Sequence, residues 1–452
     1  MSDLVLRSRR VATPGGIGPA TIHVRDGRIE AIAAHDAVPV GARVFDAADA
    51  LIMPGVVDTH VHVNEPGRTD WEGFASATQA AAAGGTTCIV DMPLNSVPAT
   101  TTASALLRKR EAARGQLFVD TGFWGGVVPG NLGELAPMAA GGALGFKCFL
   151  IDSGVDEFGC VGEPELRPAL RELARLSRPL LVHAELAGPI DAAAAAGAAG
   201  RDSPGAKARY SSWLWSRPRA SEDAAVWLMA RLCRETRARV HIVHHSSADA
   251  LPLLREARRE GLPLTAETCP HYLHFAAEDV ADGRTEFKCA PPIRERENRE
   301  ALWRALGEGT LELIASDHSP CTPALKTPGD FSAAWGGVAG LQLLLSVTWT
   351  EASLRGYTIA HLLRWLCEGP ARLAGLSDRK GALRVGCDAD FVVWRPEETF
   401  RVDPSRLLHK HKVTPYAGLE LRGVVEATFV RGQQIFDNGE VRGPARGREV
   451  TR

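Results

Sequence analysis

The sequence predicts an α/β protein: a (β/α)8, TIM-like barrel with a small composite β-sandwich domain built from both termini. Three observations support this. Between about residues 52 and 320, short apolar or β-branched runs alternate with longer helix-like segments, as in repeated β-α units with a parallel sheet. Both chain ends instead carry short alternating strands separated by tight-turn dipeptides. The 452 residues also exceed the usual size of a single core, which suits a barrel with an appended domain.

Eight strands are expected in the central region, because eight apolar runs are followed by turn or helix-like segments. In chain order they are residues 51–63 (LIMPGVVDTHVHV), 86–92 (TTCIVDM), 117–126 (LFVDTGFWGG), 143–150 (ALGFKCFL), 179–185 (PLLVHAE), 239–247 (RVHIVHHSS), 262–273 (LPLTAETCPHYL) and 311–320 (LELIASDHSP). Helices are expected between them, for example over 70–84, 165–177 and 221–237, where apolar residues recur three to four positions apart. Eight such units indicate a closed barrel.

The two ends of the chain are expected to pair into one β-sandwich. Their segments ATIHVRDGRIEAIA and VVEATFVRGQQIFDNGEV contain DG and NG dipeptides, which favour hairpin turns. Chain termini often lie close together in space, so a domain assembled from both is plausible. We therefore predict that residues 1–51 and 381–452 form the two parts of the sandwich and that residues 52–380 form the barrel.

The composition argues against several classes of partner. The net charge is −2 and charged residues make up 23% of the chain, so nucleic acid is not an expected partner. The start MSDLVLRSRR lacks the apolar region of a signal peptide, and no run of about 18 apolar residues could cross a bilayer. We expect a cytoplasmic protein without a membrane partner. Nine cysteines without C-x-x-C spacing indicate reduced core thiols, and we expect no catalytic role for Cys88 or Cys148.

Metal-binding side chains recur at the carboxyl ends of the predicted strands, where barrel enzymes build their active sites. They are His60 and His62 (first strand), Lys147 (fourth), His183 (fifth), His244 (sixth) and Asp317 (eighth). Because side chains alternate along a strand, His60 and His62 share a face and can hold one metal, and Asp58 lies on that face too. A lone strand histidine is more often a hydrogen-bonded core residue. Four histidines and an aspartate at one end of a barrel favour a metal site, since each unpartnered buried polar group costs about 1–3 kcal/mol.

Lys147 is the unusual member of this set. A protonated lysine beside two divalent cations would be repelled, so its amine must be neutral or chemically converted. Carboxylation by carbon dioxide would give a carbamate, N6-carboxylysine, whose two oxygens could bridge two metals. The alternative is a lysine that extends out of the barrel toward water. That alternative fits poorly with the flanking Phe146, Cys148 and Phe149, which are typical of a buried parallel strand.

Five segments together resemble the cyclic amidohydrolases of the amidohydrolase superfamily, which include allantoinases, dihydroorotases and hydantoinases. The segments are DTHVHVNEPGRTDWEGF, GFKCFL, LVHAE, VHIVHHSS and ASDHSPC. The resemblance spans almost the whole chain and implies a (β/α)8 barrel, a composite β-sandwich and a binuclear metal centre. It implies the following roles: His60 and His62 on one metal, His183 and His244 on the other, Lys147 as the carboxylated bridge, and Asp317 as both ligand and catalytic base. It also implies that three further histidines do not bind the catalytic metals: His241, His245 and His271.

The cofactors implied by the resemblance are two divalent metal ions per chain and the carbon dioxide of the lysine carbamate. Zinc is the first expectation, and cobalt, manganese or iron would also accept nitrogen and oxygen ligands. The metals would acidify a bridging water, giving hydroxide near neutral pH, and polarise the ring carbonyl. Asp317 would accept the proton of the hydroxide and deliver it to the departing ring nitrogen. The resemblance further implies a homotetramer acting on a small molecule.

The residues beside the metal motifs favour one branch of these relatives. Dihydroorotases usually carry an arginine two positions after the second histidine, where this chain has Asn64, and the loss of that arginine leaves a substrate carboxylate without its bidentate partner. Hydantoinases place a tyrosine shortly after the lysine, and KCFLIDSGVDEF contains none. By contrast, NEPGRTDWEGF, MPLNSVPATT, KCAPPIR, SDHSPCTPALK and GDFSAAWGGVAGLQ resemble allantoinases, which implies that the ring of allantoin opens to allantoate. The alternatives are a hydantoinase or dihydropyrimidinase, a dihydroorotase, or a non-catalytic scaffolding relative.

Neutral ureide and imide groups call for matched donors and acceptors rather than charge. The candidates to hold them are Asn95 and the backbone around Cys289, Ala290, Gly336 and Gly337. In the loop after the histidine pair, we expect Glu65 and Arg68 to form a charge pair that orders the loop. Arg217 and Glu222 are expected to make structural charge contacts.

Overall fold

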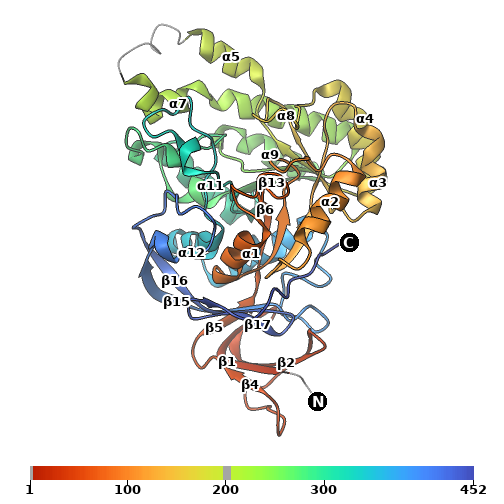
Figure 1. Ribbon diagram of the computed structural model, residues 1–452, viewed down its shortest axis with the longest axis vertical. Coiled ribbons are helices and arrows are strands. Elements are labelled where there is room, and N and C mark those ends of the chain that lie inside the picture. Colours follow the sequence, from red (N-terminus) through yellow and green to blue (C-terminus); the bar gives the residue numbers. More distant parts are fainter. Residues whose placement is uncertain (1–3, 197–204) are drawn as a thin grey trace.

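A computed structural model of the protein describes residues 4–196 and 205–452 (Figure 1). Eight parallel strand positions form its barrel: β6 (Val56–Val61), β7 (Thr86–Asp91), β8 (Asp120–Phe123) continued by β9 (Gly125–Gly126), β10 (Phe146–Phe149), β11 (Leu180–His183), β12 (Val240–Ile242), β13 (Leu264–Thr268) and β14 (Leu313–Ile314). A parallel bridge between Val61 and His318 joins the first position to the eighth. The predicted α/β barrel with a composite sheet from both termini is confirmed.

A nine-stranded sheet combines the two ends of the chain, red and blue at the foot of Figure 1. From the amino-terminal side it takes β1 (Leu4–Thr13), β2 (Gly16–Arg25), β3 (Arg28–Ala33), β4 (Val44–Asp46) and β5 (Leu51–Pro54). From the carboxyl-terminal side it takes β15 (Phe391–Arg401), β16 (Glu420–Val430), β17 (Gln433–Asp437) and β18 (Glu440–Val441). Strand β5 pairs antiparallel with β15, which joins the two halves of the sheet.

Two hairpins of this sheet use the predicted turn residues. Asp26 and Gly27 connect β2 to β3, and Asn438 and Gly439 connect β17 to β18. All four residues have positive φ angles. Two-residue turns with positive φ at both positions match the right-handed twist of the flanking strands, which is why DG and NG suit them.

Helices fill the connections between barrel strands and cover the outside of the barrel (Figure 1). They are α1 (Phe74–Ala83), α2 (Ala103–Ala113), α3 (Leu135–Ala140), α4 (Glu163–Arg175), α5 (Ala187–Ala196), α7 (Tyr210–Ser216), α8 (Arg219–Thr236), α9 (Leu251–Arg259), α10 (Pro270–His274), α11 (Arg296–Glu308), α12 (Leu344–Leu354), α13 (Ile359–Leu362), the π-helical η8 (Leu363–Glu368) and α14 (Gly369–Ala374). Short 3-10 turns are η1 (Leu132–Glu134), η2 (Ala206–Ala208), η3 (Ala248–Ala250), η4 (Ala277–Asp279), η5 (Thr285–Phe287), η6 (Pro323–Lys326), η7 (Leu341–Leu343) and η9 (Pro404–Arg406).

Helix α4 shows why the spacing of apolar residues predicts a helix that packs against the barrel. Leu166, Ala169, Leu170 and Leu173 are buried at a spacing of three to four residues, so one stripe of the helix faces the core.

Three predicted elements differ in detail from the structure. The run 51–63 is divided: Leu51–Pro54 joins the terminal sheet as β5, and only Val56–Val61 enters the barrel. The run 262–273 is strand only to Thr268, and its end forms α10. The last residues of the chain return to the barrel, where Glu449 bridges Thr121 of β8. The domain boundaries after residues 51 and 380 stay a prediction. In the part of the chain that the structure describes, no helix is both long and apolar enough to span a membrane.

Candidate active site

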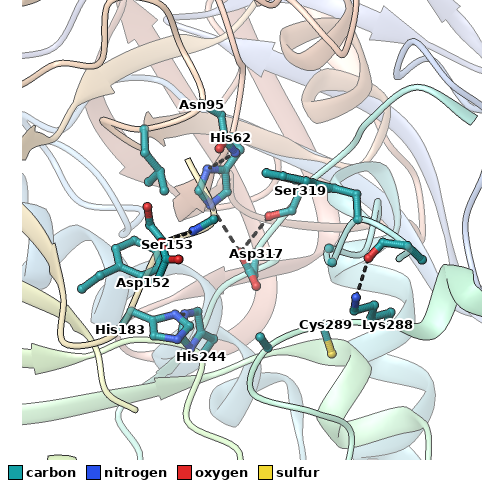
Figure 2. Close-up of a pocket in the computed structure, with 18 of the residues that line it drawn as sticks. His62, Asn95, Asp152, Ser153, His183, His244, Lys288, Cys289, Asp317 and Ser319 are labelled. Atoms are coloured by element: carbon teal, nitrogen blue, oxygen red, sulfur yellow. Dashed lines mark hydrogen bonds and ion pairs between the residues drawn. The ribbon is translucent and has the colours of Figure 1, made fainter. Parts of the chain in front are cut away.

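The six metal-type residues named from the sequence lie together at the carboxyl ends of the barrel strands, and ten residues of the pocket are labelled in Figure 2. His60 belongs to β6 and His62 follows it, Lys147 lies in β10, His183 ends β11, His244 follows β12 and Asp317 follows β14. At most 6% of any of these residues is exposed. Because the strands are parallel, their carboxyl ends meet at one rim, which brings together residues far apart in sequence.

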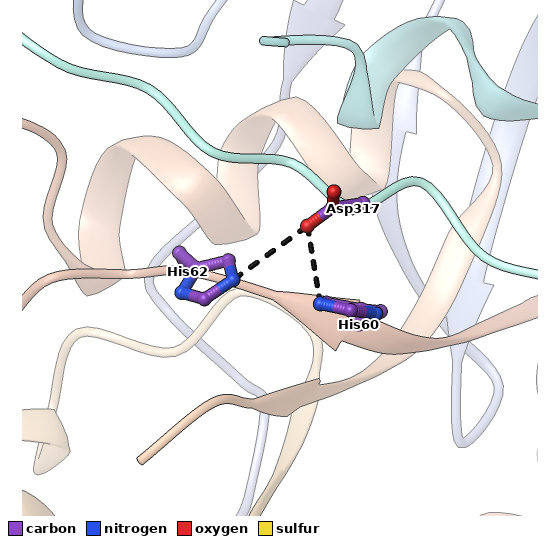
Figure 3. Close-up of side chains that lie close together, drawn as sticks. All are labelled: His60, His62 and Asp317. Atoms are coloured by element: carbon purple, nitrogen blue, oxygen red, sulfur yellow. Dashed lines mark ion pairs between the residues drawn. The ribbon is translucent and has the colours of Figure 1, made fainter. Parts of the chain in front are cut away.

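One half of the site is formed by the H-x-H pair and the aspartate (Figure 3). Asp317 Oδ1 lies 3.1 Å from His60 Nε2 and 3.6 Å from His62 Nε2. On the other side of its ring, His60 Nδ1 donates to Glu267 Oε1 at 2.6 Å. The Glu267 contact keeps a proton on Nδ1 of His60 and turns Nε2 toward Asp317 and the site.

The other half is formed by two histidines from neighbouring strands. His183 Nδ1 lies 3.0 Å from His244 Nε2 (Figure 2). His183 Nε2 donates to the buried carboxylate of Glu185 at 2.8 Å, so the Nδ1 lone pair points at His244. Nδ1 of His244 is buried and has no hydrogen-bond partner among the described residues. The two halves are close, since the rings of His60 and His244 have centroids 5.4 Å apart.

Burial dominates the electrostatics of the site. It lowers the pKa of His62 to about 4 and those of His183 and His244 well below the ordinary value, which keeps these rings neutral. Burial also acts to lower the pKa of His60, but the Asp317 carboxylate raises it to about 8. Burial lowers the pKa of Lys147 to about 8, so its amine is more readily neutral than that of an exposed lysine.

These donors fit a divalent cation. Ligand atoms of His60, His62 and Asp317 all lie within 4.8 Å of one another. Neutral imidazoles and a carboxylate are the nitrogen and oxygen ligands that zinc and similar metals take. Nε2 of His60 has no hydrogen-bond partner among the described residues, and Nδ1 of His183 faces Nε2 of His244 at 3.0 Å. Cations bound at these nitrogens would satisfy them.

The backbone is strained at two of these residues. His244 and Asp317 have φ angles of 37° and 45°, in the left-handed region that residues other than glycine rarely adopt. Asn64 and Asn95, in the neighbouring loops, have φ angles of 66° and 67°. Such strain persists only where the surrounding structure enforces it, and it concentrates at functional sites.

The side chains line a pocket of about 290 Å³, close to the lower limit of roughly 300 Å³ for small-molecule sites. The five predicted substrate contacts all lie on its wall: Asn95, Cys289, Ala290, Gly336 and Gly337. Asn95 Nδ2 lies 3.4 Å from His62 Nδ1, and its Oδ1 has no hydrogen-bond partner within the described part of the chain. Gly337 has a φ of 138°, and a Cβ there would lie 2.5 Å from the Ser319 carbonyl oxygen, so only glycine fits.

Several residues of the site were not predicted from the sequence. Glu185 orients His183, and Glu267 orients His60. The sequence could have indicated both, because each is a carboxylate in or just after an apolar strand. Ser319 donates to Asp317 Oδ1 at 3.1 Å, two residues beyond it. Trp213 and Lys288 also line the pocket, with the Lys288 ammonium 4.5 Å from the centre of the Trp213 ring.

The predicted structural contacts of Arg217 and Glu222 are present. Arg217 pairs with Glu185 at 2.7 Å and also lines the pocket, and Glu222 pairs with Arg294 at 2.6 Å. Asp58 accepts the backbone N–H groups of His60 and Ser316, so it ties the first strand position to the eighth and does not line the pocket.

The prediction that Glu65 and Arg68 form an ion pair with each other is wrong. Arg68 pairs with Glu157 and donates to the carbonyl of Asn95, whereas Glu65 accepts the N–H of Phe74 at the start of α1. Both residues order the loop, but through partners distant in sequence. All nine cysteines are free thiols, and eight of them are buried as expected, whereas Cys160 is exposed.

The chain matches known proteins along its whole length. Residues 51–435 match the model of the amidohydrolase family. The chain is 50% identical over 455 residues to an allantoinase of Streptomyces avermitilis, with 100% of each chain covered. It is 45% identical over 399 residues to an allantoinase of Saccharomyces cerevisiae, covering 87% of this chain and 84% of the yeast protein. Among solved structures, an L-hydantoinase (dihydropyrimidinase) from Arthrobacter aurescens has a TM-score of 0.94 and 33% identity over 100% of both chains.

Proposed function

This chain belongs to the amidohydrolase family, and we propose that it hydrolyses the hydantoin ring of allantoin to give allantoate. The observation that carries this proposal is the convergence of four histidines, Lys147 and Asp317 at one buried end of the barrel. A cyclic amide is the substrate class of the curated relatives, and the chain covers its Streptomyces relative completely.

We assign the binding of two divalent cations, zinc by preference, to the six residues of this set. His60 and His62 would hold one cation, His183 and His244 the other, and Asp317 would be a further ligand. Lys147, carboxylated on its amine by carbon dioxide, would bridge them. When bound, the cations would acidify a water molecule and polarise the ring carbonyl. Support for the carbamate is the position of Lys147, which is buried and lines the pocket together with the four histidines. Among the described residues, no carboxylate forms an ion pair with its amine, although Asp317 and Glu267 are close enough to act on its pKa.

Asp317 is proposed as the general base and acid. As water oxygen bonds to the ring carbonyl carbon, the Asp317 carboxylate would take the water proton, and it would return that proton to the ring nitrogen as the C–N bond breaks. Ser319 donates to Oδ1 of the same carboxylate, which steadies its orientation. The other oxygen is thereby left available for proton transfer.

The ureide and imide groups would be held by Asn95 and by backbone groups of Cys289, Ala290, Gly336 and Gly337. The unpartnered Oδ1 of Asn95 supplies an acceptor, and glycine at 337 lets the backbone come close to the site. Trp213 Nε1 donates to the Cys289 carbonyl at 3.1 Å, which positions this part of the wall.

A second candidate is hydantoin or dihydropyrimidine hydrolysis, because the L-hydantoinase structure superposes so closely. Side-by-side turnover of allantoin, hydantoin, dihydrouracil and dihydroorotate, with metal content measured on the same preparation, separates the two. We expect allantoin to have the highest kcat/KM and close to two metals per chain. A higher kcat/KM for hydantoin or dihydrouracil would replace the proposal with the second candidate.

The protein is also proposed to act as a cytoplasmic homotetramer, on the strength of its likeness to the cyclic amidohydrolases. Light scattering coupled to size-exclusion chromatography gives the mass, and a value other than four times the 48.4 kDa chain would contradict the tetramer.

A further inference from the structure

Asp317 belongs to a second group of side chains that can bind a metal, besides the group that it forms with His60 and His62. A ring nitrogen of His271, the sulfur of Cys269 and a carboxylate oxygen of Asp317 all lie within 4.8 Å of one another. Cys269 comes directly after β13, and His271 lies two residues further on in α10. Both are fully buried. The barrel rim therefore holds a sulfur, nitrogen and oxygen triad beside its main site.

His271 is the observation that points to a ligand. Neither of its ring nitrogens has a hydrogen-bond partner among the residues that the structure describes. Buried polar side-chain atoms are satisfied in the large majority of cases, and an exception calls for an ion, a water or a functional role. One ring nitrogen of His271 lies within 4.8 Å of the Cys269 sulfur and of a carboxylate oxygen of Asp317.

We propose that Cys269, His271 and Asp317 form a separate site for a thiophilic divalent cation such as cadmium, and that its occupancy inhibits the enzyme. Thiolate, imidazole and carboxylate together favour soft or borderline metals over hard ones such as magnesium. As the metal–sulfur bond forms, the thiol proton leaves to solvent. The cation takes the Asp317 carboxylate from the neighbouring histidines, since one carboxylate serves both groups.

Cation binding and inhibition depend on different assumptions. Binding needs only the three side chains, whereas inhibition rests on the proposed role of Asp317 in hydrolysis. The sulfur makes binding visible by itself, because none of the six proposed ligands of the main site carries sulfur. Cys289 also lines the main pocket, so a metal–thiolate absorption reports on this triad when it is lost with Cys269.

The test uses the zinc-loaded full chain in a Cys160→Ser background, because Cys160 is the exposed thiol and would bind cadmium at the surface. Cadmium is added to this protein and to the Cys160→Ser/Cys269→Ser double variant, and the ultraviolet cadmium–thiolate absorption and bound cadmium are measured. We expect one thiolate-bound cadmium per chain in the background protein and none in the double variant. Equal absorption in both would overturn the proposal.

Substitution of His271, the second proposed ligand, gives an independent test. His271→Gln in the same background should weaken cadmium binding at least about tenfold while leaving the thiol in place. Unchanged affinity would remove His271 from the site and overturn the triad.

X-ray absorption at the cadmium edge identifies the atoms around bound cadmium in the Cys160→Ser protein. This measurement does not depend on whether the Cys269→Ser variant folds. One sulfur with nitrogen and oxygen neighbours supports the triad, and a shell without sulfur, or with two sulfurs, overturns it.

Inhibition is measured on the same proteins, each relative to its own cadmium-free turnover. Cadmium should inhibit the Cys160→Ser protein and should inhibit the double variant much less. Thiolate binding without any inhibition would overturn the inhibitory part. A protein that fails to hydrolyse allantoin but shows the cadmium–sulfur signal would refute the proposed substrate and leave the cation site standing, so the two proposals fail separately.

Discussion

Asp317 illustrates how much can depend on one side chain. Its Oδ1 lies near His60, His62 and Ser319, and its backbone is in the left-handed region. The thiol of Cys269 and a ring nitrogen of His271 also lie within 4.8 Å of one of its carboxylate oxygens. Burial acts to raise its pKa, but the neighbouring His60 lowers the pKa well below the usual range, so the carboxylate stays ionised and can accept a proton.

Replacing Asp317 by Asn should therefore keep the fold and reduce turnover by about 10²- to 10⁴-fold, the usual contribution of a general base. The amide has nearly the size of the carboxylate but cannot accept and return the proton. The comparison is kcat at saturating metal, with the circular dichroism melting curve as the check on folding. Near-normal kcat in a metal-saturated variant would exclude Asp317 from proton transfer.

Lys147→Ala should lose bound metal and activity together, because the bridging oxygens disappear. A short carboxylic acid such as propionate should restore part of both, and a short amine should not. Lys109 is the matched control: it is equally buried but pairs with Asp91 at 2.6 Å. Lys109→Ala should destabilise the protein without rescue by acid. Full metal content and turnover in Lys147→Ala would defeat the bridging role.

Glu267 and Glu185 should act on metal affinity through the histidines that they orient. Glu267 also accepts from His241 Nε2 at 3.0 Å, so its carboxylate is held from both sides. Glu267→Gln or Glu185→Gln should weaken metal binding about 10- to 100-fold, as expected for partners of ligating histidines. Competition with a chelator measures this, and Glu312→Gln, at the opposite end of the barrel, serves as the control. Affinities equal to that of the control would argue that the rings need no such partner.

At the scale of elements, strand ends were predictable and loop partners were not. Apolar runs placed all eight strands, and strand ends in a barrel converge, so His60, His183 and Asp317 could be grouped from spacing alone. Side-chain parity could not choose among the three histidines at 241, 244 and 245, because the strand ends at Ile242 and a left-handed residue follows at 244. There the resemblance to a family implied His244, and of the three it is His244 that lines the pocket.

Contacts between loops carry no local signal. Arg68 forms an ion pair with Glu157, and Glu65 accepts a hydrogen bond from Phe74 at the start of α1. The tertiary path of the chain brings these partners together, and the residues adjacent in sequence do not indicate them. The splitting of the first strand had a local reason that could have been used: Pro54 and Gly55 interrupt the run between β5 and β6.

Glu312, which lies between strands β13 and β14, should make the stability of the protein depend on pH. It precedes β14 and accepts the N–H of Ala266 in β13, and burial raises its pKa to about 7. A carboxyl whose pKa is higher in the folded than in the unfolded protein favours folding at low pH, and this contribution is lost as pH rises from about 4.5 to 7. Glu312→Gln should therefore stabilise the protein at pH 8 relative to wild type, more than at pH 5. Urea unfolding at both values measures the difference, and an equal effect would contradict the shift.

The whole molecule depends on a junction between barrel and terminal sheet. Lys380 lies 2.6 Å from Asp120 of β8 and 2.5 Å from Asp390, just before β15, with Asp388 at 2.9 Å. Arg431, just after β16, pairs with Asp120 as well. Burial acts to lower the pKa of Lys380, but Asp390 and Asp120 raise it above the usual range, so the ammonium stays charged at neutral pH. One lysine thus joins carboxylates from both parts of the protein.

Lys380→Met should destabilise the protein by about 3–5 kcal/mol, because removing one partner of a buried ion pair leaves the remaining charges uncompensated. The three aspartates would repel one another across the junction, while the proposed metal site at the opposite end of the barrel strands stays intact. Urea unfolding at neutral pH measures the loss, and metal content of the folded protein checks that the effect is not local to the site. Arg9→Ala is the matched control, since the Arg9–Asp49 pair at 2.8 Å is largely exposed and should contribute little to stability. Equal stability losses in the two variants would show that the barrel and the sheet are held together by apolar packing instead, with the buried charges contributing no more than a surface pair.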